Sequence, residues 1–105
     1  MIADKSYFLH ERDEKGKLKP MTVEIDEGVD VEITPIPEGE MSKLADFISQ
    51  KNLKQAYIVI SAHLIQPKIT PDEIENAGKS GKIGLIVDKI IEVSKLGKHD
   101  KGKAD

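Results

Sequence analysis

The sequence predicts an α+β fold, in which a small N-terminal antiparallel β-meander is followed by a bundle of about four helices. In residues 21–33, apolar and polar residues alternate with a period of two, which is typical of strands with one buried face. After Pro37, apolar residues recur at steps of three and four, which is typical of amphipathic helices. The chain of 105 residues is 38% hydrophobic and 33% charged, a balance that favours one globular domain.

The meander is expected within residues 1–36. Its three strands are predicted to be the apolar run Tyr7–Leu9 and the alternating runs at 21–25 and 29–33. Gly16 and Gly28 lie in turn-forming segments between these runs. Pro35 and Pro37 end the last strand, because proline has no N–H group for the ladder.

Two helices are expected next. The first is indicated by an apolar face at helical spacing, formed by Met41, Leu44, Ala45 and Ile48. Asn52 is expected to interrupt the pattern. The following segment, 55–65, is apolar on nearly all sides, so periodicity alone does not separate a buried helix from a buried strand. Its length and an apolar stripe along it favour a helix, and a strand over 56–64 paired into the sheet would contradict that prediction.

A capping box marks the start of a short third helix. Thr70 is expected at the N-cap, where its hydroxyl accepts a hydrogen bond from a free amide of the first turn. Pro71 occupies the first helical position, where its missing N–H has no effect. Glu73 completes the box by accepting a hydrogen bond from the N-cap amide. This helix is expected to end near Gly78.

The last helix is expected to begin with Ser80 as its cap and to end at Gly97. Its apolar stripe is Ile83, Ile86, Val87, Ile90 and Val93. Residues 98–105 contain no apolar anchor, so we expect a disordered tail there. Residues 1–97 are therefore predicted to form a single α+β domain.

Charge and hydropathy exclude several kinds of partner. Residues 1–40 carry five basic and eleven acidic side chains, whereas residues 41–105 carry eleven basic and eight acidic ones. Neither part has the clear positive excess of a nucleic-acid footprint, so no nucleic-acid partner is expected. No apolar run is long enough to span a bilayer and no signal-peptide pattern is present, so we expect an intracellular protein without a membrane partner.

No catalytic, cofactor or metal site is expected, and the chain is predicted not to be an enzyme. The histidines, His10, His63 and His99, have no second ligand at helical spacing. His63 is interpreted as a partly buried helix residue with one satisfied ring nitrogen. The serines have no nucleophile elbow, and the absence of cysteine excludes thiolate chemistry. Carboxylates on the predicted strands are interpreted as a solvated face.

The order of the segments resembles that of the phage tail assembly chaperone family. The resemblance rests on residues 7–12 before the Gly16 turn, the strand end Thr34–Pro37, the segment His63–Glu75, and Leu85–Ile90 leading to Val93 and Ser94. It covers residues 6–97. Such proteins often end with Ser-Gly-Leu, where this chain has Ser94-Lys95-Leu96-Gly97.

That resemblance implies a non-enzymatic chaperone that binds the tape-measure protein of a tailed phage or prophage during tail morphogenesis. It also implies tail-tube subunits as further partners, a location in the host cytoplasm, and absence from the mature virion. The family has no catalytic motif, so no functional residues carry over. The alternative is another small phage structural or interaction protein, such as a tail-tube or head–tail joining component.

Three isoleucines lie beside the main apolar stripes and are the candidate partner-binding residues: Ile58, Ile65 and Ile91. Exposed aliphatic residues of this kind can contact a partner or a second copy of the chain in a homo-oligomer. They can equally complete a small core, and the sequence leaves both interpretations open.

Overall fold

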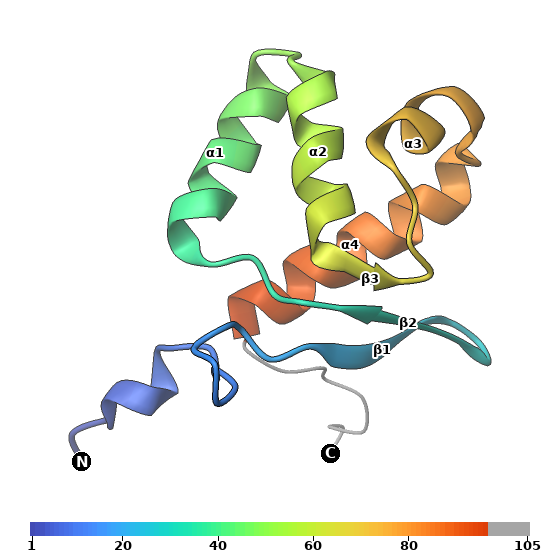
Figure 1. Ribbon diagram of the computed structural model, residues 1–105. Helices are drawn as coiled ribbons and strands as arrows, with labels where there is room; N and C mark the ends of the chain where they lie inside the picture. Colours follow the sequence, from blue (N-terminus) through green and yellow to red (C-terminus); the bar gives the residue numbers. More distant parts are fainter. Residues whose placement is uncertain (97–105) are drawn as a thin grey trace.

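The computed structural model describes residues 1–96, in which a three-stranded antiparallel sheet lies against four helices (Figure 1). The elements are a 3-10 turn at Lys5–Tyr7, β1 Met21–Asp26, β2 Val29–Ile33, α1 Glu38–Ser49, α2 Leu53–His63, β3 Leu64–Gln66, α3 Pro71–Ala77 and α4 Ser80–Leu96. The predicted α+β class is therefore confirmed. The predicted tail at 98–105 and the helix end at Gly97 lie outside the described residues.

β1 and β2 form the hairpin that the alternation predicts. Val23 and Val31 are paired across the two strands and are both buried. Glu24 and Asp30 are the next pair, and alternation places them on the opposite face of the sheet. Gly28 in the turn has a φ angle of 73°, a left-handed conformation that glycine adopts without a steric penalty.

The third strand lies elsewhere than predicted. Tyr7 ends a 3-10 turn, and the following Phe8 and Leu9 are exposed rather than paired in the sheet. A run of three apolar residues has no alternation and no partner strand, so nothing holds it extended. Within this part of the chain, only Arg12 and Leu18 form an isolated β-bridge.

β3 completes the sheet from a distant part of the sequence. Leu64 pairs with Ile33 of β2, so the strand order is β1-β2-β3 although α1 and α2 separate β2 from β3. The segment predicted as one helix over 55–65 is therefore a helix that ends at His63 and continues as a short strand. Alternation along β3 buries Leu64 and leaves Ile65 exposed.

The predicted N-cap is confirmed for α3 but differs for α4. The Thr70 capping box is confirmed, with hydrogen bonds of 3.1 Å from the Glu73 amide to Thr70 Oγ1 and 3.0 Å from the Thr70 amide to Glu73 Oε1. Ser80 was expected to cap α4 but is its first helical residue. The carbonyl of Lys79 accepts from the amides of Lys82 and Ile83, so Lys79 holds the cap position.

The core is aliphatic and lies between the sheet and the helices. Its buried residues come from every strand and every α-helix: Val23, Val31, Ile33, Ile36, Leu44, Ala56, Val59, Ile60, Leu64, Ile74, Ile86, Ile90 and Val93. α4 runs along the sheet and packs on β1, while α1 and α2 form an antiparallel pair that stands away from the sheet (Figure 1). Within residues 1–96, no helix has the length and apolar content needed to cross a membrane.

Candidate partner-binding pocket

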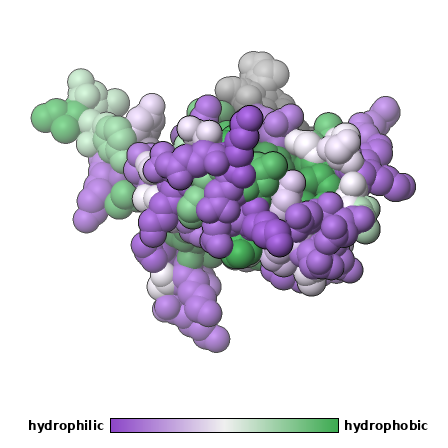
Figure 2. All heavy atoms as spheres, turned by 90° about the horizontal axis from the view of Figure 1, so that it is seen from above, coloured by the Kyte–Doolittle hydropathy of each residue, from purple (hydrophilic) through white to green (hydrophobic). Residues whose placement is uncertain are grey.

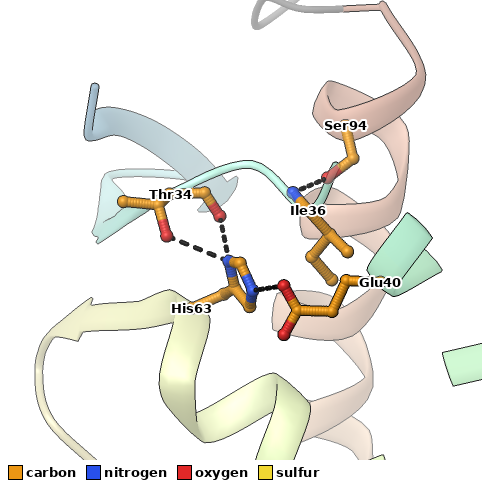
Figure 3. A network of polar contacts seen from close by, with 5 residues as sticks. All are labelled: Thr34, Ile36, Glu40, His63 and Ser94. Carbon is orange, nitrogen blue, oxygen red and sulfur yellow. Dashed lines mark hydrogen bonds and ion pairs between the residues drawn. The ribbon is translucent and has the colours of Figure 1, made fainter. Parts of the chain in front are cut away.

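A partly buried polar network holds the base of the α1–α2 pair, next to the sheet (Figure 3). His63, at the end of α2, is only 8% exposed. Its Nδ1 lies 3.0 Å from Thr34 Oγ1 and 3.2 Å from the Thr34 carbonyl oxygen. Its Nε2 lies 2.9 Å from Oε1 of Glu40 in the first turn of α1. One side chain therefore joins α1, α2 and the residue that follows β2.

Both ring nitrogens of His63 have hydrogen-bond partners, whereas the sequence predicts only one satisfied nitrogen. The Thr34 hydroxyl can donate to Nδ1 or accept from it, whereas the Glu40 carboxylate accepts from Nε2, so each ring nitrogen has a partner. Glu40 lies 23 residues before His63, which is why no local spacing revealed the pair.

The Thr34–His63–Glu40 row contains the components of a nucleophilic triad, but its geometry supports a structural role. Nδ1 faces the Thr34 carbonyl oxygen as well as the Thr34 hydroxyl, so the ring holds both the main chain and the side chain of this residue. None of the three residues lines the apolar pocket at the other end of the helices. Within residues 1–96, no group of three or more potential metal ligands comes together.

Ser94 extends this support to α4. Its hydroxyl is buried and accepts a 2.8 Å hydrogen bond from the Ile36 amide, in the segment that joins β2 to α1 (Figure 3). Pro35 and Pro37 flank Ile36 and supply no amide of their own, so this bond satisfies a backbone donor that no strand partner reaches. The same network thus fixes α1, α2 and α4 at the sheet end.

An apolar pocket of about 260 Å³ opens at the other end of these helices. It is named the four-helix pocket because all four α-helices contribute to its wall. Its lining consists of Leu44, Ile48, Leu53, Ala56, Tyr57, Ile60, Ile74, Ile83 and Val87. Apart from Tyr57, whose side chain is a phenol ring, every lining side chain is aliphatic, which is the composition expected for a site that takes up apolar side chains.

The rim of the four-helix pocket exposes large aliphatic side chains. Ile48 near the end of α1 is 48% exposed, and Leu53 at the start of α2 is 45% exposed. They flank the tight connection between the two helices, where Lys51 has a φ angle of 59°. Figure 2 looks down on this end and shows a group of apolar atoms near the middle of the face, with hydrophilic atoms beside it. Such a patch with a polar rim is typical of a protein-interaction site.

The three predicted partner-binding residues do not line this pocket. Ile58 is exposed on α2 and Ile65 is exposed on β3, whereas Ile91 is half-buried on α4. Because Ile58 and Ile65 are accessible, their contact with a partner stays a prediction. The pocket residues were recognised in the sequence only as the apolar faces of separate helices, because the cavity depends on how four helices are placed relative to one another.

Comparison with protein-family models, with curated proteins and with solved structures finds no match for this chain.

Proposed function

We propose that this chain is a non-enzymatic tail assembly chaperone of a tailed phage or prophage. It binds an apolar helical segment of the tape-measure protein in the four-helix pocket, acts in the host cytoplasm before the tail tube forms, and is not retained in the virion. The observation that carries the proposal is an open pocket with an aliphatic lining, whose rim exposes Ile48 and Leu53.

The pocket suits the way in which proteins hold amphipathic helices. Such helices insert apolar side chains at steps of three, four and seven residues into a hydrophobic groove. Covering a rim residue such as Ile48 or Leu53 removes roughly half of its side chain from water, which contributes about 1 kcal/mol. Several anchors of this size give a complex that is specific but reversible, as a chaperone requires.

Co-expression with the tape-measure protein of the same phage or prophage, followed by pull-down, tests this function. We expect Ile48→Ser and Leu53→Ser to weaken capture about fivefold or more, because each places a hydroxyl where an apolar side chain must be covered. Their thermal midpoints should change little, since both residues are exposed at the rim.

Ile58→Ser is the matched comparison for Ile48→Ser, because it tests the partner contact predicted for Ile58 against binding in the pocket. The two isoleucines are 47% and 48% exposed and lie on neighbouring helices, but Ile58 is outside the four-helix pocket. Equal capture by wild type and Ile48→Ser, with loss on Ile58→Ser, would move the binding surface to the outer face of α2. Retention by all the variants would contradict binding at either place.

A second candidate function is a structural tail-tube or head–tail joining component. It is favoured by the N-terminal segment, which projects from the body and exposes Tyr7, Phe8 and Leu9 (Figure 1). The rings of Tyr7 and Phe8 are in edge-to-face contact at 5.0 Å, so they form one apolar unit that another subunit can cover. Purified tails distinguish the candidates, because a structural component stays in them and a chaperone does not.

A further inference from the structure

The N-terminal segment 2–12, named the arm, carries apolar side chains that the rest of the described chain leaves uncovered. Ile2, Tyr7, Phe8 and Leu9 are between 58% and 96% exposed, and every residue from 1 to 9 is exposed. The arm projects from the body (Figure 1), and none of its residues lines the four-helix pocket. The proposed binding of a tape-measure helix therefore does not use these side chains.

A recess of about 340 Å³ lies at the base of the arm. Phe8 and Leu9 form part of its wall together with Leu18 and Pro37. A cavity of roughly 150 Å³ is enough to bind benzene, so the recess has room for an aromatic side chain. The Tyr7 and Phe8 rings, in edge-to-face contact, project beside it. A projection next to a recess can be covered by an identical surface turned by 180°, because each projection then meets the recess of the other.

The area of this surface is sufficient for a reversible dimer. Covering Tyr7 and Phe8 removes about 300 Å² of their surface from water in each copy. Ile2 and Leu9 add to this area, and the walls of the recess are covered at the same time. Weak, reversible complexes bury less than about 600 Å² per partner, so an interface of this size agrees with a dimer that forms and dissociates readily.

Charged residues flank the aromatic pair in a self-complementary order. Asp4 and Lys5 precede the pair, and Glu11 and Arg12 follow it. When two arms lie antiparallel with Phe8 at the centre, Asp4 of one copy is opposite the partner's Arg12, and Lys5 is opposite the partner's Glu11. In a parallel arrangement, each of these residues would face an identical charge. Charge complementarity therefore favours a second copy of the chain in the antiparallel orientation.

The contacts that these charged groups make within one copy leave them accessible. Glu11 forms an ion pair with Lys19 at 3.2 Å, but the Glu11 side chain is 79% exposed. One guanidinium nitrogen of Arg12 donates to the Gly16 carbonyl at 2.6 Å, and an arginine has further N–H donors. Among the ion pairs of residues 1–96, none involves Asp4 or Lys5. Contacts with a second copy therefore do not require these local contacts to break.

We propose that two copies of this chain form a dimer through their arms. The arms lie antiparallel about Phe8, and the Tyr7–Phe8 pair of each copy enters the recess of the other. This inference does not depend on the proposed function, because the arm and the four-helix pocket share no lining residue. The dimer therefore presents two four-helix pockets, one from each copy.

Sedimentation equilibrium between about 1 µM and about 1 mM protein tests for the dimer. Phe8→Ser should raise the dissociation constant about tenfold or more, because it removes the central ring of both arms. Leu9→Ser should raise it about threefold. Leu53→Ser is the matched control, since it makes the same change at an exposed leucine that lies in the four-helix pocket. It should leave the dimer unchanged, and thermal melts verify that each variant is folded.

A charge exchange tests the antiparallel orientation. Lys5→Glu should raise the dissociation constant about fivefold, because it places like charges opposite each other at two symmetric positions. The double variant Lys5→Glu/Glu11→Lys restores opposite charges at both positions, so its dissociation constant should return to within about twofold of wild type. The effect of Lys5→Glu should shrink at high salt, because salt screens exposed charges.

Three results would overturn the proposal. A wild type that stays monomeric at the highest concentration leaves the arm to a different protein, as the second candidate function requires. A dimer that persists in Phe8→Ser uses another surface. A dimer that Phe8→Ser disrupts but Lys5→Glu leaves unchanged contradicts the antiparallel orientation. In each case, capture of the tape-measure protein by the four-helix pocket is measured separately with Leu53→Ser, so failure of the dimer does not count against the proposed function.

Discussion

The two ends of the α1–α2 pair are held by different kinds of interaction. At the sheet end, His63 and Ser94 make directed hydrogen bonds to the segment that follows β2. At the open end, aliphatic side chains line a pocket that solvent can reach. Hydrogen bonds require particular distances and angles, whereas apolar contacts are non-directional. The sheet end can therefore fix the helices, while the open end has the non-directional lining that our proposal assigns to a binding site.

Removing His63 should have the largest effect. We expect His63→Ala to lower the free energy of unfolding by about 3 kcal/mol, because it leaves a cavity and removes the partner of Thr34 and Glu40. Urea denaturation measures this loss. Glu40→Gln is the control, since its amide oxygen still accepts from Nε2 and its side chain is partly exposed, and it should cost about 1 kcal/mol or less. A loss below 1 kcal/mol for His63→Ala would show that the network does not fix this end.

A methyl group at Gly78 should have the next largest effect and act on the open end. A Cβ there would lie 2.6 Å from the Ile74 carbonyl oxygen and 2.9 Å from Cγ1 of Ile83. We expect Gly78→Ala to destabilise by about 2 kcal/mol and to weaken partner binding, because the methyl group clashes with the last turn of α3 and with Ile83 of α4.

Gly84→Ala is the matched control for this change. It adds the same methyl within α4 where no atom beyond the neighbouring residues and the helix's own backbone lies within 4 Å, so it should stabilise the protein by up to about 1 kcal/mol. Calorimetry on both variants compares them directly. Similar midpoints for Gly78→Ala and Gly84→Ala would contradict close packing between α3 and α4.

Loss of the Thr70 cap should have the smallest of the three effects. We expect Thr70→Ala to lower stability by about 1 kcal/mol, because the Glu73 amide loses its acceptor. α3 contributes Ile74 to the four-helix pocket, so a small loss of affinity should accompany it. Thr70→Ser keeps the hydroxyl and should restore most of the urea midpoint. An unchanged midpoint in Thr70→Ala would mean that the cap does not support α3.

Local signals predicted most of this fold. The hairpin, the Thr70 capping box and the apolar stripe of α4 depend on residues within a few positions of each other, and the structure confirms them. The third strand was misplaced because its formation depends on a distant partner. Leu64 is extended at the end of α2 because it pairs with Ile33, and the sequence around Leu64 reads as a continuing helix.

The candidate site was less accessible to sequence reasoning than the fold. Each helix shows its apolar face, but the sequence does not show which part of that face the other helices leave uncovered. Ile48 and Leu44 lie on the same predicted stripe, yet Leu44 is buried and Ile48 is exposed at the pocket rim. Ile83 similarly lines two separate pockets because several elements approach α4 around it.

The α1–α2 pair is inserted between β2 and β3, two strands that are neighbours in the sheet. β2 and β3 are neighbours in the sheet, and the Thr34 amide donates to the His63 carbonyl at 2.9 Å, so residues 34–63 leave and re-enter the sheet at one point. A loop closed at its base can change length at its tip without altering the order of the strands. Insertions or exchanges near 49–53 can thus reshape one rim of the pocket, while the sheet and α4 stay as they are.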